Sequence, residues 1–271
     1  MKELKIVCLV KNHPHTVYFV NRITQVHPVS LVLVESEPVI AVSFLIKART
    51  LLRNYFTYFV GRKKPKVKSI SFDEVFSDMG KQFDPKLKIK YVQNINSSEV
   101  LKILKANKFD LLLDHGTSLL SSEIIGSAKL ALNLHWGLSP YYRGTHCTDW
   151  ALINWDPYNI GVTIHKLAKK IDGGDILAQE RVEPTDVTRA KAINLLLTKV
   201  GTELIIKIAG RLKQGKQLKF FKQDFSRGYM TTTRQWNSYL QQQLEYIETP
   251  EVFEKMLAKP ARRIRLPIIK I

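Results

Sequence analysis

Two polar residues stand at alternate positions near the end of an apolar run. The run reads Ala-Lys-Leu-Ala-Leu-Asn-Leu-His over residues 128–135, with Asn133 and His135 on either side of Leu134. Alternate side chains of a strand project from the same face, so the amide and the imidazole would address one volume. An imidazole can take a proton from an attacking group, and an amide can donate to an oxygen that gains negative charge. From the spacing alone, a hydrogen-bonded pair at a strand end is the alternative.

Three more motifs follow this pair in a fixed order. A loop ends in Pro140-Tyr-Tyr-Arg-Gly144, an extended run reads Gly161-Val-Thr-Ile-His165, and a turn carries Asp172 two residues before Gly174. Taken as a set, these motifs resemble the formyltransferases that use 10-formyltetrahydrofolate. That family includes enzymes that act on glycinamide ribonucleotide, on methionyl-tRNA and on the amines of sugar nucleotides. The resemblance is carried by residues 109–183, and before them only the order of elements is similar.

The resemblance implies that Asn133, His135 and Asp172 form the catalytic set. In formyl transfer an amine attacks the formyl carbon, so charge gathers on the formyl oxygen and a proton leaves the nitrogen. Asn133 and His135 would stabilise that oxygen, and His135 with a water ordered by Asp172 would move the proton. A plain turn residue is the alternative for Asp172. His115 and His165 are expected to be structural.

The resemblance also implies which residues bind the two substrates. The predicted contacts to the folate, chiefly through backbone groups of two loops, are Gly116, Leu119, Leu120, Leu167, Ala168, Lys169 and Ile171. The predicted contacts to the acceptor are His13, Ser139, Tyr141 and Arg143. His15 is, with His13, a candidate for contacts to the phosphate or sugar of the acceptor because both follow the first strand, and plain surface-loop positions are the alternative for both histidines. After the catalytic histidine the family has a Ser-Leu-Leu-Pro pattern, whereas this chain has Gly137 at the position of that serine. Ser139 is the candidate to replace the missing hydroxyl.

These residues need a sheet to hold them, and the pattern of the chain predicts one. Apolar runs alternate with helical stretches, which is typical of a mostly parallel, doubly wound α/β sheet. The predicted strands are residues 4–10, 29–35, 87–93, 109–116 and 128–135, and the predicted helices between them are residues 16–25, 97–108 and 121–128. Ligands of such sheets bind beyond the carboxyl ends of the strands, where Asn133 and His135 would lie. No Gly-x-Gly-x-x-Gly follows the first strand, so the dinucleotide fingerprint is absent.

The rest of the chain divides into two parts. Two extended runs, residues 159–167 and 175–183, are joined by a turn with two glycines that give it conformational freedom, and a long amphipathic helix is predicted over residues 188–213. We therefore assign residues 1–213 to a formyltransferase-like catalytic domain. Residues 214–271 form a small basic C-terminal extension in which the pattern predicts no defined element.

The formal net charge of +18 indicates an anionic partner. Residues 47–68 contain eight basic residues and no acidic one. Residues 38–60 are predicted to form an amphipathic helix, whose charges argue against a transmembrane span. One interpretation is an interfacial helix on an anionic membrane surface, formed within residues 38–68, and the other is a core-packing helix with a solvated basic face.

The cysteines indicate a reducing compartment. Cys8 and Cys147 stand far apart, and no secretory signal pattern opens the sequence, which predicts a cytoplasmic location, membrane-peripheral if the interfacial interpretation holds. Cys8 lies in an apolar run and is expected to be a small buried residue. Cys147 has His146 and Asp149 as neighbours, but no second ligand pair stands at a suitable spacing, so no metal site is predicted.

The acceptor is predicted to be the amine of a sugar nucleotide, a small phosphorylated molecule. Family members that act on transfer RNA carry a further β-rich domain, for which the extension is too short, so nucleic acid is not the expected partner. Members that act on glycinamide ribonucleotide have a Gly-rich phosphate loop after the first strand, which is absent here. These two acceptors, hydrolysis of the folate and a non-catalytic basic binding protein remain the alternatives. The pattern does not decide between a monomer and a homodimer.

Overall fold

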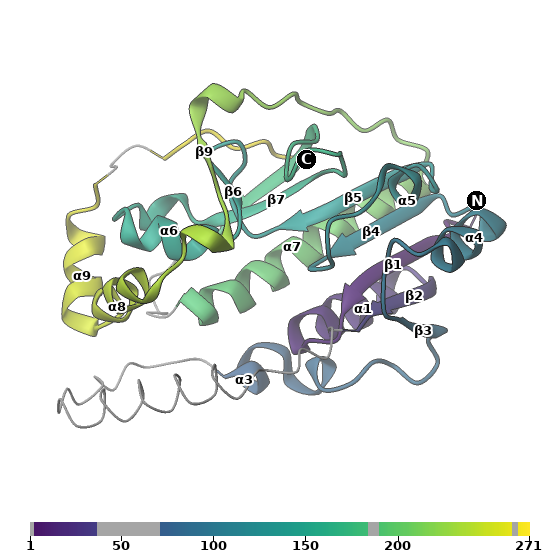
Figure 1. The fold of residues 1–271 in the computed structure, drawn as a ribbon, viewed down its shortest axis with the longest axis horizontal. Helices are drawn as coiled ribbons and strands as arrows, with labels where there is room; N and C mark the ends of the chain where they lie inside the picture. Colours follow the sequence, from purple (N-terminus) through teal and green to yellow (C-terminus); the bar gives the residue numbers. More distant parts are fainter. Residues whose placement is uncertain (1–2, 37–70, 184–189, 262–264) are drawn as a thin grey trace.

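A central β-sheet with helices on both faces forms the body of the protein (Figure 1). The computed structural model describes residues 3–36, 71–183, 190–261 and 265–271. The strands are β1 (Ile6–Lys11), β2 (Val29–Glu35), β3 (Ile89–Val92), β4 (Leu111–His115), β5 (Leu130–His135), β6 (Tyr142–Gly144), β7 (Gly161–Lys166), β8 (Ile176–Arg181) and β9 (Tyr229–Thr231). The α-helices are α1 (Pro14–Val26), α3 (Phe72–Phe76), α4 (Ser98–Asn107), α5 (Ser122–Ile125), α6 (Cys147–Ile153), α7 (Ala190–Lys213), α8 (Ser238–Ile247) and α9 (Pro250–Ala258). Short 3-10 helices are η1 (Ser77–Gly80), η2 (Pro157–Asn159), η3 (Phe225–Arg227) and η4 (Thr233–Gln235).

The main sheet has seven strands in the order β3-β2-β1-β4-β5-β7-β8. All neighbours from β3 to β5 run parallel. β7 pairs with β5 in the antiparallel sense and forms an antiparallel hairpin with β8. The prediction of a mostly parallel, doubly wound α/β sheet is therefore confirmed, as is the pairing of the two later extended runs.

Alternate residues of the strands fill two separate cores. Ile6, Cys8 and Val10 of β1 belong to one core, which continues into α1 and α7. Val7 and Leu9 belong to the other, which continues into α4 and α5. Burial on both faces explains why the sequences of these strands are continuous apolar runs. Each fully buried apolar side chain stabilises the fold by about 1.5–3 kcal/mol relative to an exposed one. The prediction that Cys8 is a small buried residue is confirmed.

The C-terminal part has more regular structure than the sequence pattern predicts. β9 pairs in parallel with β6 in a second, two-stranded sheet, and α8 and α9 contact each other beside α6 (Figure 1). Residues of α8 and α9 that join the main core are Leu244, Ile247, Val252, Phe253 and Met256. A three-residue strand is too short to show alternation, and helices of two to three turns owe their stability to packing rather than to local sequence.

The basic segment cannot be compared with its prediction. The helix predicted over residues 38–60 and all eight basic residues of the segment 47–68 lie outside the described residues. Among the helices that the structure does describe, none is long and apolar enough to cross a membrane.

Candidate active site

The carboxyl ends of neighbouring strands bring polar side chains into one row. Asn133 of β5 is paired with Asp114 of the parallel strand β4 and with His165 of the antiparallel strand β7. Paired residues of adjacent strands project from the same face of the sheet, and His135 projects from this face two residues further along β5. Leu134 points the other way, into the core that contains α7.

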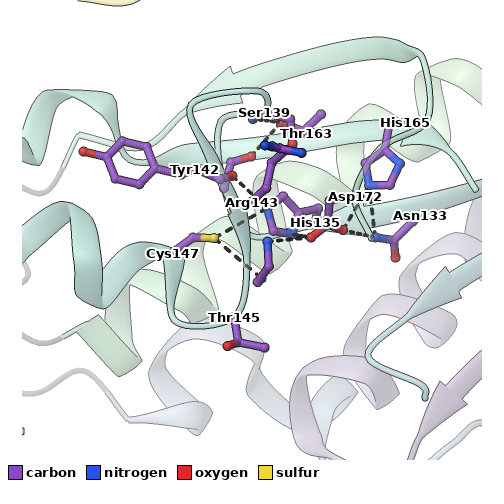
Figure 2. Close-up of polar contacts among 12 residues, drawn as sticks. Asn133, His135, Ser139, Tyr142, Arg143, Thr145, Cys147, Thr163, His165 and Asp172 are labelled. Atoms are coloured by element: carbon purple, nitrogen blue, oxygen red, sulfur yellow. Dashed lines mark hydrogen bonds and ion pairs between the residues drawn. The ribbon is translucent and has the colours of Figure 1, made fainter. Parts of the chain in front are cut away.

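Asp172 lies over this row and contacts three of its members (Figure 2). Its Oδ1 is 3.3 Å from His165 Nε2 and 3.5 Å from Asn133 Nδ2. Its Oδ2 is 3.5 Å from His135 Nδ1 and accepts a hydrogen bond of 2.8 Å from the backbone N–H of Gly144. The amide, two imidazoles and the carboxylate thus form one continuous polar cluster.

Asp172 is held as a carboxylate. Burial alone would raise its pKa, but the attraction of His135, the contacts with His165 and the backbone hydrogen bond from Gly144 outweigh burial. The pKa of Asp172 therefore lies well below its usual range. An ionised carboxylate at this position can compensate the positive charge that His135 gains when it takes up a proton.

His135 can take up a proton through one ring nitrogen. Its Nε2 lies 3.1 Å from the backbone carbonyl oxygen of Tyr142, so we assign the hydrogen of the neutral ring to Nε2, which donates to that oxygen. This assignment leaves Nδ1, which faces Asp172, to accept a proton. Burial lowers the pKa of His135 from 6.5, and the nearby Asp172 offsets part of that effect. The ring is therefore neutral at neutral pH.

Cys147 lies behind His135. Its Sγ is 3.6 Å from His135 Nε2, and burial raises the pKa of the thiol well above its usual value, so it stays protonated. The neighbouring His146 and Asp149 contact each other, with 2.7 Å between Nδ1 and Oδ2. Within the described part of the chain, no group of three or more His, Cys, Asp or Glu residues is arranged to hold a metal ion.

The turn that carries Asp172 is shaped by close backbone contacts. Asp172 itself has a φ of 45°, in the left-handed region that non-glycine residues seldom adopt. A Cβ on Gly174 would lie 1.8 Å from the carbonyl oxygen of Lys166. The sequence pattern attributes conformational freedom to the two glycines of this turn. In the structure, Gly174 instead provides room for a close approach, and the unusual conformation falls on Asp172.

The polar cluster opens into a cleft of about 390 Å³. Asn133, His135 and Asp172 line the cleft. All the residues predicted to bind the folate also line it: Gly116, Leu119 and Leu120 after β4, and Leu167, Ala168, Lys169 and Ile171 after β7. Apolar side chains next to backbone polar groups suit a planar heterocycle, and the volume is within the usual range of small-molecule sites, about 300–1,000 Å³.

The wall after β4 is tied to the body of the protein by two side chains. Glu35 accepts a hydrogen bond of 2.7 Å from the backbone N–H of Ser118. Asn96 Nδ2 donates to the carbonyl of Leu119 at 2.9 Å, and Asn96 Oδ1 accepts from the N–H of Ser121 at 2.7 Å. Asn96 therefore brackets the segment that contributes Leu119 to the cleft.

The loop after β5 packs tightly around His135. A Cβ on Gly137 would lie 2.5 Å from His135 Nε2 and 2.6 Å from the carbonyl oxygen of Tyr142, so no side chain fits there. Ser139 is 1% exposed and does not line the cleft, and its backbone N–H donates to Thr163 Oγ1 at 3.0 Å. Ser139 therefore cannot offer its hydroxyl to a ligand in the cleft, and it does not replace the hydroxyl that is missing at Gly137.

None of the other residues predicted to contact the acceptor, apart from His15, lines this cleft. Arg143 is 5% exposed, and its Nε donates to the carbonyl of Pro140 at 3.2 Å. Tyr141 lines a separate cavity. His13 precedes α1, and its ring stacks on that of His15 with 5.4 Å between the centroids. Of these residues only His15 lines the cleft.

The structure adds His165 and Gly144 to the polar cluster. The sequence pattern assigns His165 a structural role, whereas its ring contacts both Asn133 and Asp172. The alternation that places His165 and Thr163 on one face is visible in the sequence. The sequence does not show which strand β7 pairs with. The antiparallel pairing of β7 with β5 places His165 opposite Asn133.

Comparisons with known proteins agree with this fold. The model of a family described as Formyl transferase matches residues 5–208. The bifunctional polymyxin resistance protein ArnA of Wigglesworthia glossinidia brevipalpis is 34% identical over 115 residues, which make up 42% of this chain but only 17% of that relative. A 4-N formyltransferase from Francisella tularensis superposes with a TM-score of 0.54 and 18% identity, covering 100% of both chains. A sugar N-formyltransferase from Shewanella sp. superposes with a TM-score of 0.57 and 14% identity, covering 98% of this chain and 99% of that one. These two structures share the fold of this chain over nearly its whole length.

Proposed function

The chain belongs to the formyl transferase family, and from this premise we propose that it transfers a formyl group from 10-formyltetrahydrofolate to the primary amine of a sugar nucleotide. The observation that carries the proposal is the convergence of Asn133, His135 and Asp172 on one cleft. The three groups supply a hydrogen-bond donor, a proton acceptor and a counter-charge. An amine that attacks a carbonyl carbon needs all three.

The proposed roles follow from the contacts of each group. The folate supplies the activated formyl group. Asn133 Nδ2 lies within reach of both Asp172 and His165, and one of its two N–H groups would turn to the formyl oxygen as that oxygen gains charge. His135 Nδ1 accepts the proton of the attacking amine, while Tyr142 keeps the ring in the required tautomer. Asp172 stabilises the imidazolium that results.

The folate is proposed to lie between the loops after β4 and β7. Both loops present backbone groups and apolar side chains to the cleft, and Asn133 lies between them at the end of β5. This arrangement would place a bound heterocycle beside the catalytic cluster.

A cytoplasmic location, predicted from the two unpaired cysteines, belongs to the same proposal.

The sugar-nucleotide acceptor is supported by charge and by the kind of protein that shares the fold. The chain carries a net charge of +18, which would attract a diphosphate. Two solved structures that match over nearly the whole length of both chains are a sugar N-formyltransferase and a 4-N formyltransferase.

A survey of amines with 10-formyltetrahydrofolate tests the proposal. We expect one or more amino-sugar nucleotides to gain the mass of a formyl group, with release of tetrahydrofolate in equal amount. Tetrahydrofolate released without a formylated product would instead assign the protein as a hydrolase. If no amine yields a formylated product or tetrahydrofolate, even at enzyme concentrations close to those of the substrates, formyl transfer would be overturned.

A further inference from the structure

The chain continues past the family match and returns to the catalytic cluster. The match ends at residue 208, within α7. After α7 the chain runs along the edge of the main sheet towards β9 (Figure 1). On this path Phe221 and Ile176 of β8 exchange two backbone hydrogen bonds, each of 2.8 Å. This bridge sets the register of the residues that follow it.

Gln223 lies two residues beyond the bridge and holds the main chain of the catalytic turn. Its Nε2 donates to the carbonyl oxygen of Asp172 at 2.7 Å and to that of Gly174 at 2.6 Å. A side-chain amide carries two N–H groups, so both carbonyls can be satisfied at once. Asp172 has an unusual backbone conformation, which persists only where the surroundings hold it. Gln223 supplies such a hold from outside the turn.

Aromatic residues beside Gln223 add contacts to the same turn. The Nζ of Lys170 lies 3.5 Å from the centroid of the Phe225 ring, and the Nζ of Lys166 lies 4.0 Å from that of Phe220. Cations at these distances are attracted to the face of the ring. On either side of Gln223, the segment therefore contacts Lys166 at the end of β7 and Lys170 within the turn that carries Asp172.

The same segment also fixes a donor to the Asp172 carboxylate. Gly144, whose N–H donates to Asp172 Oδ2, lies in β6 and is paired with Thr231 of β9. Thr231 Oγ1 donates to the carbonyl of Arg143 at 3.2 Å. A Cβ on Gly144 would lie 1.9 Å from the carbonyl oxygen of Thr231, so the two strands approach as closely as glycine allows.

We propose that Gln223 is a positioning residue for Asp172, and that the segment of residues 216–231 thereby completes the active site. This inference rests on the proposed function, because it assigns a role in formyl transfer to residues beyond the family match. Gln223 does not line the cleft, so it acts on the reaction through Asp172. A displaced carboxylate would compensate the imidazolium of His135 less well and slow the chemical step.

Replacing Gln223 by methionine tests the proposal. Gln223→Met keeps the length of the side chain and removes both donors. We expect kcat to fall about 10-fold to 100-fold, as misplacement of a catalytic group by about 1 Å does, with a much smaller change in the KM of the amine. Gln217→Met is the matched control, because Gln217 lies exposed in the same segment.

A second measurement does not depend on activity. The pKa of the His135 ring, followed by NMR with labelled histidine, should fall in Gln223→Met because the attraction of Asp172 weakens, and should not change in Gln217→Met. If Gln223→Met fails to fold, Gln223→Glu keeps the shape but turns the donors into an acceptor, and its kcat should fall at least as far. Wild-type kcat together with an unshifted His135 titration would overturn the proposal. A wild-type protein that formylates no amine would count against the proposed function, while the titration would still test the positioning of Asp172.

Discussion

His135 and Asp172 each set the ionisation of the other. Burial favours the neutral forms of both groups. Contacts within the cluster outweigh burial at Asp172 and keep it ionised, whereas burial outweighs the attraction of Asp172 at His135 and keeps that ring neutral, with Nδ1 available. Tyr142 orients the neutral ring through Nε2, and Asp172 stabilises the charged form of the ring. Two predictions belong to this scale.

Asp172→Asn should remove most of the activity without unfolding the protein. The amide keeps the shape of the side chain and an acceptor for the N–H of Gly144, but it cannot balance the charge on His135. We expect kcat to fall about 10²–10⁴-fold, measured with the acceptor found in the survey. Asp78→Asn serves as the control, since the side chain of Asp78 is exposed and pairs with Lys81. An unchanged rate would remove Asp172 from the mechanism.

The acid limb of the pH–rate profile should report His135. The pKa of the ring is lowered from 6.5, so the ring stays neutral and active at neutral pH, and kcat/KM should fall only as pH drops below 6.5 and the ring becomes protonated. In Asp172→Asn the ring loses an attractive charge, so its pKa by NMR should fall further. A His135 pKa above 6.5, or one that rises in Asp172→Asn, would contradict this account.

Secondary-structure elements bring the cluster together through register and close approach. The pairings of β4, β5 and β7 align Asp114, Asn133 and His165 in one row, and the loop after β5 packs against the ring of His135. Burial raises the pKa of Asp114 to about 7, although the Thr117 hydroxyl that donates to it favours the ionised form. Substitutions of Gly137 and Asn96 test the close packing around His135 and the hydrogen bonds that hold the loop after β4.

Gly137→Ala should impair catalysis because its Cβ would displace His135 Nε2 or the carbonyl of Tyr142. We expect a loss of about 1–3 kcal/mol in stability from overpacking and a fall in kcat of about 10-fold to 100-fold. Gly210→Ala is the matched control, because its Cβ would have no neighbour closer than 3.8 Å and alanine favours the helix by about 0.5–1 kcal/mol. Thermal unfolding and kinetics of both variants would check this, and full activity of Gly137→Ala would contradict it.

Asn96→Ala should weaken binding of the folate rather than the chemical step. The change removes both hydrogen bonds that bracket the segment containing Leu119. At about 1 kcal/mol for each bond, the KM for the folate should rise about 10-fold or more, with kcat little changed. Asn107→Ala removes a hydrogen bond at the end of α4 and should leave both constants unchanged. A fall in kcat at constant KM would show that the segment acts on catalysis instead.

The whole molecule combines a strong positive charge with a fold that the C-terminal segment completes. β9 pairs with β6, Gln223 contacts the turn of Asp172, and Ile269 accepts a hydrogen bond of 2.7 Å from the backbone of Gln179 in β8. The division into a catalytic domain of residues 1–213 and an extension stays a prediction. The described contacts tie the two parts into one site.

Salt should weaken the binding of a nucleotide-linked acceptor. Raising the ionic strength from about 0.1 M to about 1 M shortens the Debye length from about 10 Å to about 3 Å. The KM for the sugar nucleotide should therefore rise several-fold, because a net charge of +18 attracts the diphosphate. The same amino sugar without its nucleotide is the control and should show little dependence on salt. Equal dependence for both acceptors would exclude attraction of the diphosphate.

The sequence by itself determined the sheet and the central pair of the site. Buried strands and amphipathic helices carry their burial in a local period, so the α/β fold and the common face of Asn133 and His135 could be predicted from neighbouring residues. The two loops that line the cleft were implied by the family resemblance. The residues that contact Asn133 and His135 could not be predicted in this way. His165 joins the pair through the pairing of β7 with β5, and Gln223 holds Asp172 across 51 residues of chain. Ser139 is buried rather than exposed to a ligand because of how the loop after β5 packs. Contacts of this kind depend on which distant segments pack together in the folded chain, and the periodicity of neighbouring residues does not determine that packing.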